Sequence, residues 1–356
     1  MKRNNAYSHK LINFFKIILI IMVCSLILAV PMTKLTLPWS MKTSYHLYGE
    51  LTRMLHLHSP NISTVDEDGV PVSDLGYQKG EYVGAQRNPL KIASQALFYY
   101  DEFQKKGDVQ DKEYFSNCIH WLENARIDKG QYCLWAYDFA NPTYHASAPW
   151  YSAMAQARIM VAFERAYELT WDDHYLYLAN TAMGALKVPI QDGGVLYIDP
   201  DDEGKWYGEL AGGGRASPPY ILNGFIFSLF DLHDFYILTG SQDAKSLFVD
   251  GITELKQHLI DYDTGRWTYY DREGHLAYDY HYIHINQLQK LYEITGDVEF
   301  KSYHDKWASY FPINPMWARE RFAAYLLDSG VIFIILAVII SSYKIYKKKS
   351  KVKTLQ

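Results

Sequence analysis

The segment YDYHYIHINQLQ, from Tyr278 to Gln289, concentrates side chains that give or take protons. It holds three tyrosines and two histidines within seven residues and continues into a pattern typical of a helix. A phenol, with a reference pKa of about 10, is a capable proton donor to a carbanion at neutral pH. His281 and His284 share a helical face, which invites a metal site. Two histidines without a third ligand are more often structural or substrate-facing, so no metal is expected here.

Four segments, in a fixed order, resemble the C-terminal catalytic domain of D-glucuronyl C5-epimerases, a family that includes the heparosan glucuronate epimerase of heparan sulfate synthesis. They are APWYSAMAQARIMVAFERAYELT, SPPYILNGFIFSLFDLHDFY, YDTGRWTYYD and YDYHYIHINQLQKLYEI. The resemblance covers about residues 84–311, and LNGF and HINQLQ are nearly verbatim. It implies an enzyme that inverts C5 of a hexuronate within a heparosan-like polysaccharide, turning D-glucuronate into L-iduronate.

The resemblance also implies the residues that act. Tyr280 matches the catalytic tyrosine of the family, and Tyr270 in TYYD matches a second functional tyrosine. Glu209 falls in WYGEL, where the family places an acidic partner in a WYEEY-like stretch. A C5–H beside a carboxylate is a very weak carbon acid, so its removal needs a base on one face and a proton donor on the other. We expect Glu209 and Tyr280 to form this pair, with Tyr270 assisting at the carboxylate or the ring oxygens.

Three arginines are candidates to bind the uronate carboxylate. Arg272 lies one place earlier than the arginine of the family, and Arg215 and Arg87 are further candidates. Asn223 in LNGF is expected to bond loop backbone or a sugar hydroxyl, and His281 and His284 complete the candidate substrate contacts. The chain departs from the family pattern after the glutamate, where Leu210 replaces a tyrosine and three extra positions surround the AGGG of residues 211–214.

Other functions remain open from the sequence. A polysaccharide lyase also begins by removing the C5 proton, and a non-catalytic surface glycan-binding protein would explain the loss of a tyrosine at Leu210. A glycoside hydrolase needs two carboxylates flanking the bond, and only Glu209 is well placed by motif. No GxGxxG fingerprint is present, and no organic cofactor is expected. The acidic turns DEDG (66–69) and DPDDEG (199–204) are candidate calcium sites, although solvated turns are the better interpretation.

The fold class indicated is mainly α. Four segments each predict a helix, a short turn and a second helix, with Asp108, Asp173, Asp243 and Asp297 at the corners. Helical hairpins that bury one face against the next give an α/α toroid or incomplete α/α barrel. Phe98, Phe163, Phe227 and Trp307 are expected in its core. The excursions between hairpins, such as RWTYYD, predict short β hairpins in the active-site loops.

Both ends of the chain predict membrane segments. Residues 1–33 combine a basic stretch with the apolar run Ile17–Val30, which is typical of a retained signal-anchor or of a cleaved signal peptide. Residues 322–346 are expected to span the membrane, and a basic tail, 347–356, follows. Because Lys and Arg collect on the cytoplasmic side, both termini are expected there, with the catalytic domain, 85–321, outside the cytoplasm. Residues 34–84 are expected to be an irregular or β-rich lead-in.

Charge and cysteine content narrow the partners. A net charge of −5 without a basic stripe through the middle of the chain gives no case for nucleic acid. Thirty-one tyrosines and nine tryptophans suit a saccharide groove. The expected partners are a uronic-acid polysaccharide and the membrane, and a homodimer stays open. Cys118 and Cys133 could be disulfide-bonded or free.

Overall fold

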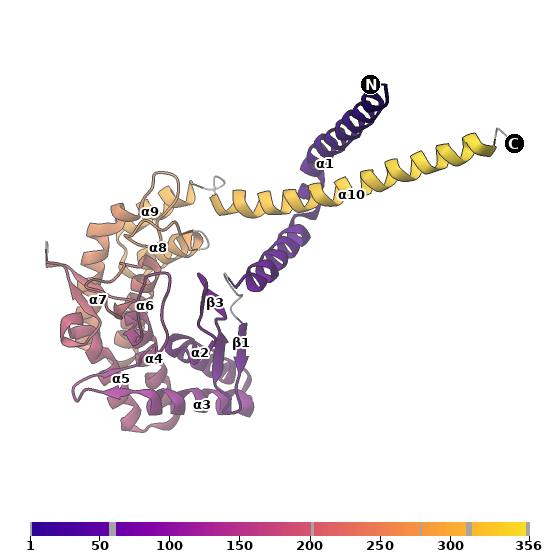
Figure 1. Cartoon of the computed structure of the whole chain (residues 1–356). Helices are drawn as coiled ribbons and strands as arrows, with labels where there is room; N and C mark the ends of the chain where they lie inside the picture. The colour runs from indigo at the N-terminus through magenta and orange to yellow at the C-terminus, as the bar shows by residue number, and fades with distance from the viewer. Residues whose placement is uncertain (1, 57–61, 201–202, 278–279, 311–314, 354–356) are drawn as a thin grey trace. The chain divides into compact units, whose positions relative to one another are not determined.

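The computed structural model describes residues 2–56, 62–200, 203–277, 280–310 and 315–353. It separates into two compact units, each taken here by itself. One unit contains residues 1–51 and 313–356, and the other contains residues 52–312 (Figure 1).

Helical hairpins build the larger unit. Its α-helices are α2 Pro89–Lys106, α3 Val109–Ala125, α4 Ala153–Thr170, α5 Asp173–Gly184, α6 Leu222–Thr239, α7 Gln242–His258, α8 His281–Thr295 and α9 Val298–Ala308. Short 3-10 helices are η1 Ala185–Lys187, η2 Ile190–Asp192 and η3 Leu259–Tyr262. Consecutive helices pair as α2 with α3, α4 with α5, α6 with α7 and α8 with α9, while α2, α4, α6 and α8 pack side by side in that order. The predicted helical hairpins are confirmed, and their order is that of an open α/α toroid.

Aspartates mark the hairpin corners, as predicted. Asp108 and Asp297 are the N-cap residues of α3 and α9, and their carboxylates accept hydrogen bonds from the backbone N–H two residues later. Asp173 and Asp243 lie in the first turns of α5 and α7, whose caps are the preceding Asp172 and Ser241. A carboxylate in a first turn is stabilised by the helix dipole, so these positions begin each outer helix.

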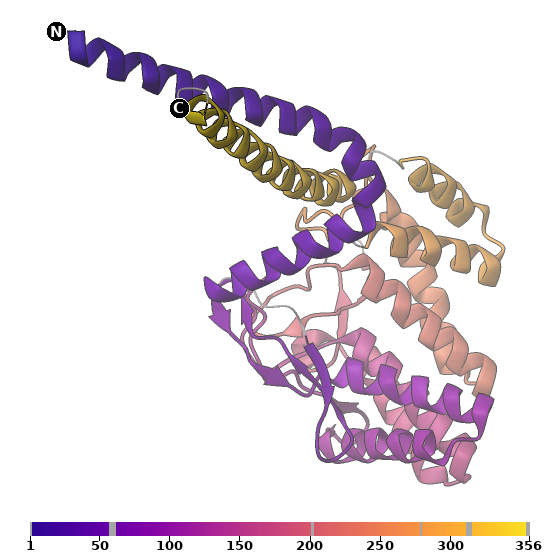
Figure 2. The ribbon, with the colours of Figure 1, turned by 90° about the vertical axis from the view of Figure 1, so that its right-hand side faces the viewer.

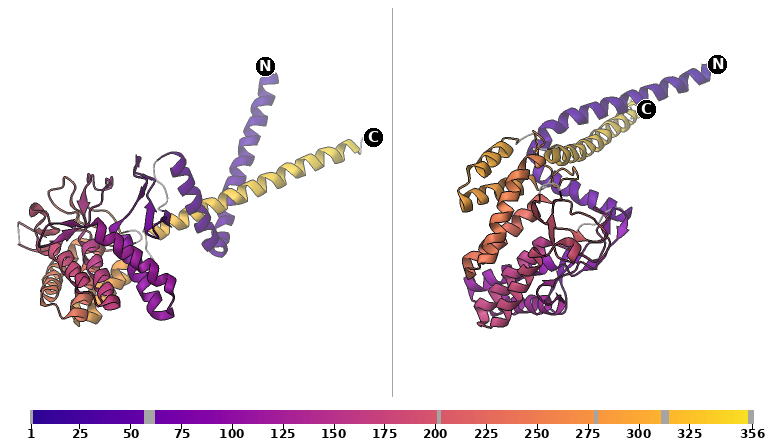
Figure 3. Two further views of the ribbon diagram at one scale, coloured as in Figure 1. Left: turned by 90° about the horizontal axis from the view of Figure 1, so that it is seen from below. Right: turned by 90° about the vertical axis from the view of Figure 1, so that its left-hand side faces the viewer.

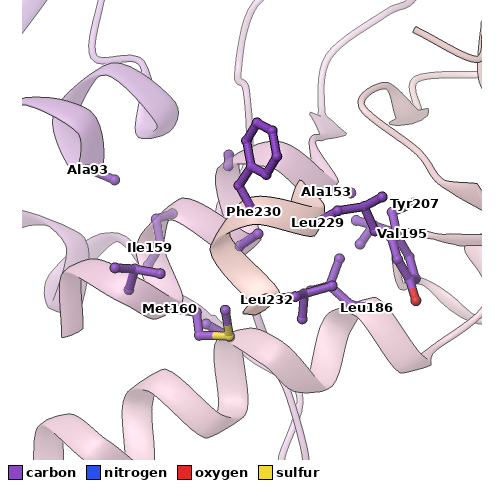
Figure 4. Close-up of a cluster of buried hydrophobic side chains, with 14 of the residues drawn as sticks. Ala93, Ala153, Ile159, Met160, Leu186, Val195, Tyr207, Leu229, Phe230 and Leu232 are labelled. Carbon is purple, nitrogen blue, oxygen red and sulfur yellow. The ribbon is translucent and has the colours of Figure 1, made fainter. Parts of the chain in front are cut away.

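The core fills the space between the inner helices. Helices α4 and α6 are the most deeply buried, and Figure 4 shows side chains such as Met160, Leu229 and Leu232 gathered among them. Phe163 and Trp307 are fully buried, as predicted. The prediction for Phe98 is wrong, because 53% of this residue is exposed. Its neighbours Ala96 and Tyr100 face the core instead, so Phe98 lies on the other side of α2.

Short strands and loops complete the larger unit and gather on one side of the helices (Figure 3). The strands are β1 Ile62–Val65, β2 Pro71–Asp74, β3 Tyr77–Gln78, β4 Glu81–Tyr82, β5 Ala85–Gln86, β6 Ile127–Asp128, β7 Cys133–Leu134, β8 Trp150–Tyr151, β9 Leu196–Ile198, β10 Lys205–Tyr207 and β11 Ala211–Gly212. All pairings are antiparallel: β1–β2–β5 form one sheet, and β3–β4, β6–β7, β8–β11 and β9–β10 form two-stranded ladders. The β9–β10 hairpin confirms the prediction for that loop, whereas RWTYYD forms isolated bridges only.

The predicted lead-in needs a correction. Helix α1 runs over Lys2–Met54, so the prediction of irregular or β structure is wrong for residues 34–54, while β1 to β5 agree with it over 62–86. Pro31 and Pro38 each remove a backbone hydrogen bond from α1 without ending it, and Figure 2 shows that this helix is bent. Polar contacts to α10 (Pro315–Lys353) hold this part of α1 helical.

Those contacts converge on one aspartate of α10. Asp328 is fully buried and accepts hydrogen bonds from Thr33 Oγ1 at 2.8 Å, Thr36 Oγ1 at 2.9 Å and Ser40 Oγ at 2.8 Å. One turn away, the Tyr325 hydroxyl donates to the carbonyl of Leu26. Residues 12–33 of α1 and 323–346 of α10 are each long and apolar enough to cross a bilayer. Three hydroxyls on one carboxylate therefore join the two candidate spans.

The cysteines of the larger unit are not bonded to each other. Cys118 on α3 and Cys133 in β7 are both buried and free. Burial raises the pKa of the Cys118 thiol to about 12. Of the two alternatives left by the sequence, the structure has the free thiols, which pack as small apolar side chains.

Candidate active site

The WY pair before Glu209 anchors this segment on α6. Trp206 stacks on Phe225 of LNGF, with ring centroids 3.8 Å apart and planes inclined by 13°. The Tyr207 hydroxyl donates to the carbonyl of Leu247 at 2.6 Å, and its ring lies among Val195 and Leu229 (Figure 4). Both aromatic residues are fully buried. The WYGEL and LNGF motifs are therefore two halves of one packing contact.

Backbone hydrogen bonds fix the residue directly before Glu209 from two sides. The N–H of Gly208 donates to the carbonyl of Val195 at 2.8 Å, and the carbonyl of Gly208 accepts from the N–H of Ala153 at 2.8 Å. Strand β11 then begins at Ala211 and pairs with β8. Glu209 is thus held between two anchored backbone segments at the start of α4 and α6.

Gly224 makes room for the carboxylate of Glu209. A Cβ placed on Gly224 would lie 1.6 Å from Glu209 Oε2 and 2.6 Å from its Cδ. No side chain fits at that separation, so the carboxylate lies directly against the first turn of α6. A glycine is therefore needed at this position of LNGF, because a carboxylate from another segment approaches its backbone closely.

The surroundings of Glu209 leave its carboxylate poorly solvated. Oε2 is buried and has no hydrogen-bond partner among the residues that the structure describes. Burial raises the pKa of Glu209 to about 7. A carboxylate that costs free energy to ionise because it is buried is a more basic one. Such a group suits proton abstraction near neutral pH.

Tyr270 and Tyr280 lie together, and Tyr270 is near enough to Glu209 to feel the charge of its carboxylate. Their ring centroids are 4.8 Å apart. Burial raises the pKa of Tyr270 well above its usual value, and the negative charge of Glu209 raises it further. The carbonyl of Tyr270 accepts from the N–H of Leu222 at 3.0 Å, which ties this loop to the start of α6. Tyr280 precedes α8 directly and is 38% exposed. The structure brings together the three residues that the sequence singled out.

A second polar group adjoins the tyrosines. Tyr144 donates its hydroxyl hydrogen to Asp271 Oδ2 at 2.6 Å, and His275 Nδ1 lies 2.6 Å from the same oxygen. Asp271 is fully buried, and its Oδ1 accepts from the backbone N–H groups of Glu273 and His275. Burial and Asp271, followed by the charge of Glu209, hold the pKa of Tyr144 far above its usual range.

Sequence reasoning missed this group. Asp271 and His275 directly follow Tyr270 in YDREGH, so their position beside a candidate tyrosine was the available signal. Tyr144 lies 127 residues before Asp271 and had no such signal.

The candidate arginines are placed differently from one another. Arg215 donates to the carbonyl of Tyr144 at 2.6 Å, pairs with Glu273, and lies over the Tyr144 ring at 5.9 Å. It is the candidate arginine with contacts to the group around Asp271. The Arg272 guanidinium instead lies over the Tyr220 ring at 4.4 Å, with Nε 3.4 Å from Asp261.

Arg87 belongs to a different place. It binds Asp66 through Nε at 2.8 Å and pairs with Asp68 at 2.5 Å, so it closes the DEDG turn. Two of the three carboxylates of this candidate calcium turn, those of Asp66 and Asp68, are thereby engaged by a guanidinium. The second candidate turn includes residues 201–202, which lie outside the described residues. Among the residues described, no group of three or more His, Cys, Asp or Glu side chains could hold a metal.

His281 and His284 face the core and not the tyrosines. Both are fully buried, and His281 stacks on Trp267 with centroids 3.6 Å apart. Thr268 Oγ1 lies 2.9 Å from Nδ1 of His281 and 3.1 Å from Nδ1 of His284. Burial lowers the pKa of His281 to about 4 and that of His284 to about 3, so both rings are neutral. Neither ring has surface that a polysaccharide could touch in this structure.

Neutral rings assign the tautomers. His281 Nε2 faces the carbonyl of Trp307 at 3.3 Å and must donate to it. Its Nδ1 then accepts from Thr268, whose oxygen accepts in turn from Nδ1–H of His284. The two histidines therefore form one internal hydrogen-bonded chain.

Asn223 is buried at the start of α6, and its Oδ1 has no hydrogen-bond partner within the described part of the chain. Its carbonyl accepts from Gln287 Nε2 at 2.9 Å. Gln287 belongs to HINQLQ, so the two motifs that stand out in the sequence contact each other here. Gln287 is a further residue whose role sequence reasoning missed.

Comparison with known proteins identifies the family of the chain. Residues 128–309, just over half of the chain, match the family described as D-glucuronyl C5-epimerase C-terminus. An uncharacterized protein of Methanocaldococcus jannaschii is 34% identical over 282 residues, which cover 74% of this chain and 90% of that protein. The D-glucuronyl C5-epimerase of Caenorhabditis elegans is 31% identical over 184 residues. That match covers 45% of this chain but only 29% of the worm protein.

A solved structure is similar in fold. The sugar epimerase from a ruminal bacterium matches with a TM-score of 0.50 at 11% identity, covering 69% of this chain and 64% of that one. At this identity the similarity extends to the fold alone.

Proposed function

Because the chain belongs to the D-glucuronyl C5-epimerase family, we propose that it converts D-glucuronate into L-iduronate within a polysaccharide. The observation that carries this proposal is the carboxylate of Glu209. Its Oε2 is buried without a partner among the described residues, its pKa is raised to about 7, and its charge acts on Tyr270, whose ring contacts Tyr280. A basic carboxylate near phenolic proton donors provides the general base and the general acid that proton transfer at a carbon atom requires.

The proposed reaction has two proton transfers. Glu209 takes the proton from C5, and the electron pair left on C5 delocalises into the adjacent carboxylate of the sugar. Tyr280 then donates its phenolic proton to the opposite face of C5, which inverts that centre. Solvent returns a proton to the Tyr280 phenolate and removes one from Glu209. No bond other than C5–H breaks, and the scheme requires no oxidant, metal or organic cofactor.

The remaining polar residues would stabilise the charge that builds on the sugar carboxylate. Tyr270 keeps its proton because its pKa is raised, so its hydroxyl remains a hydrogen-bond donor throughout the reaction. Arg215 brings positive charge near Tyr144 and Asp271. Both guanidiniums have an acidic partner, Glu273 for Arg215 and Asp261 for Arg272. We assign the carboxylate contact to Arg215 because it contacts Tyr144 beside Asp271, whereas Arg272 lies over Tyr220.

Proton exchange in heavy water tests the proposal. The full chain in detergent is incubated with an unsulfated heparosan-like polymer in D2O, and the C5–H signal is followed by NMR. Loss of the signal together with iduronate resonances is the expected result. Unsaturated sugars that absorb in the ultraviolet would identify a lyase instead. Binding of the polymer without exchange at C5 would identify a glycan-binding protein.

We further propose that the two candidate spans cross the membrane as a helical hairpin, with both termini in the cytoplasm. Basic residues at both ends of the chain support this orientation. The hydrogen bond from Thr33, at the end of the first candidate span, to Asp328 in the second also supports it, since polar side chains in spans pair with a partner helix. We also propose that the N-terminal segment is retained as an anchor.

Cysteine labelling in sealed cells tests the topology. Lys129→Cys is expected to react with a membrane-impermeant maleimide, and Ser350→Cys only after the cells are opened. Reaction of Ser350→Cys in intact cells would overturn the orientation.

A further inference from the structure

A polar hollow lies on α3, apart from the residues assigned to proton transfer. It has a volume of about 570 Å³. Asn117, His120, Trp121 and Asn124 line it from one face of α3, at a spacing of three or four residues, which places them side by side on a helix. Asp68 of the DEDG turn also lines it, together with Arg87, which pairs with that turn from just before α2. This is a volume typical of ligand sites.

A second hollow, of about 240 Å³, shares Arg87, Trp121 and Ala125 with the first and extends to Asp138. A third, of about 320 Å³, is lined by residues 139–143 and by Leu75, Gln78 and Val83. The next residue along the chain is Tyr144, which binds Asp271 beside the candidate catalytic tyrosines. One segment, residues 135–144, therefore borders two of the hollows and ends at the candidate active site.

We propose that these hollows bind uncharged sugar units of the same polysaccharide whose uronate enters at Glu209. This inference rests on the proposed function. It adds where the sugar units that flank the reacting uronate bind and which kind of sugar they are. The half-buried indole of Trp121 offers an apolar face to a sugar ring, and the amides of Asn117 and Asn124 donate and accept hydrogen bonds from its hydroxyl or N-acyl groups.

The charges of the hollows select against anionic sugars. The positive charge of Arg87 is already balanced by Asp66 and Asp68, both of which it binds. Asp138 adds a further carboxylate to the second hollow. A sulfated unit would bring its negative charge towards these carboxylates. N-acetylated, unsulfated units therefore fit the hollows, and the substrate is a chain at an early, unsulfated stage.

The test measures binding, so it does not depend on turnover. Binding of an unsulfated octasaccharide of alternating N-acetylglucosamine and glucuronate is titrated against the full chain in detergent. Trp121→Ala is expected to weaken binding about fivefold or more, as loss of a tryptophan contact does at binding sites. Trp171→Ala is the matched control, because Trp171 is 77% exposed at the far turn between α4 and α5, and it should change binding by less than about twofold.

An N-sulfated octasaccharide completes the experiment. We expect it to bind the unaltered chain more weakly than the unsulfated one and to be insensitive to Trp121→Ala. Equal binding of the unsulfated octasaccharide by Trp121→Ala and Trp171→Ala would overturn the proposal. If Trp121→Ala does not fold, Asn124→Ala replaces it, since this side chain is exposed and its loss leaves the core intact.

The two proposals fail separately. Weaker binding by Trp121→Ala without C5 exchange in the unaltered chain would support the sugar-binding proposal and contradict the epimerase proposal. C5 exchange with an unchanged KM for the polymer in Trp121→Ala would support the epimerase proposal and contradict the sugar-binding proposal.

Discussion

Tyr280 and His281 are adjacent in the chain but belong to two different regions. Tyr280 is 38% exposed and lies against Tyr270, beside the carboxylate of Glu209. His281 is fully buried and bonds Thr268 and the carbonyl of Trp307. Helix α8 begins at His281, so Tyr280 is the last residue of the preceding loop, whereas the side chain of His281 is buried in the core.

Each region handles a buried titratable group in its own way. The histidine region bonds Nδ1 of both rings and Nε2 of His281, leaves His284 Nε2 and Trp307 Nε1 without a partner among the described residues, and keeps both rings neutral. The glutamate region leaves a carboxylate oxygen without a partner in the described structure and raises its pKa. A satisfied network stabilises a fold, whereas an unsatisfied carboxyl is available to a substrate. Burial alone does not distinguish the two regions, but hydrogen bonding does.

Glu209→Gln gives the largest expected effect on activity. The amide keeps the shape of the carboxyl but cannot take a proton, so we expect kcat for C5 exchange to fall by about 10³-fold or more. The measurement is loss of the C5–H signal in D2O. The unfolding temperature should not fall, because the carboxylate oxygen Oε2 makes no hydrogen bond within the described residues that the amide would lose. Retained exchange would remove Glu209 from the base role.

Tyr280→Phe has a matched control two residues away. Tyr282 is also 38% exposed, but its ring contacts Trp267 and His281 instead of Tyr270. We expect Tyr280→Phe to lower kcat by about 10²- to 10³-fold and Tyr282→Phe to lower it by less than about threefold. Equal losses in the two variants would show that the segment matters for packing and not for proton donation.

Gly224→Ala tests how the glutamate region is assembled. Alanine normally stabilises a helix relative to glycine, but here its Cβ would meet Glu209 Oε2. We expect the displaced carboxylate to cost about 10²-fold in kcat. Stability provides the control: in a Glu209→Ala background, Gly224→Ala should be neutral or stabilising. A cycle of the four proteins, measured by chemical denaturation, would show no coupling if the contact is absent.

The comparison also shows what sequence can supply. The helix-turn-helix spacing and the corner aspartates predicted the hairpins because helix periodicity and capping are local properties. The resemblance of WYGEL, TYYD and YDYH to a family predicted three residues that lie together. The sequence could not show that Tyr280 lies at the candidate active site and His281 in the core. Both belong to one polar segment, and only tertiary packing places their side chains in different surroundings.

Other misses have the same origin. Tyr144 reaches Asp271 across 127 residues, and no local pattern records such a contact. Residues 34–54 were predicted to be irregular or β-rich together with the DEDGVPVSDLG stretch that follows them, yet they are helical, and Thr36 and Ser40 donate to Asp328 of the distant helix α10. Arg87 looked like a carboxylate binder, and its partners proved to be Asp66 and Asp68 of its own unit.

Thr268→Val tests whether His281 and His284 have a structural role and no role in the reaction. The hydroxyl bridges both imidazoles, so its loss leaves two buried ring nitrogens without a partner. We expect a loss of roughly 1 to 3 kcal/mol in the free energy of unfolding, measured with urea. The C5 exchange rate per folded molecule should change by less than about twofold. A large drop in that rate without loss of stability would place the histidines in the reaction.

The dependence of stability on pH should have opposite signs in the two regions. The pKa of Glu209 is raised in the folded state to about 7, so its contribution is present below its unfolded value near 4.5 and is lost as pH rises through about 7. The pKa values of His281 and His284 are lowered to about 4 and 3, so their contribution is present above about 6.5 and is lost as pH falls towards those values.

Unfolding temperatures measured from pH 4 to pH 8 separate these contributions, although each amounts to only a few degrees. Relative to the unaltered chain, Glu209→Gln should gain stability progressively as pH rises from 4.5 to 7. His284→Gln should be most destabilising near pH 7 and less so in acid, where the unaltered chain must itself charge a buried ring. Parallel curves for the two variants would mean that both groups titrate alike, and the distinction between a reactive region and a structural one would then have no electrostatic basis.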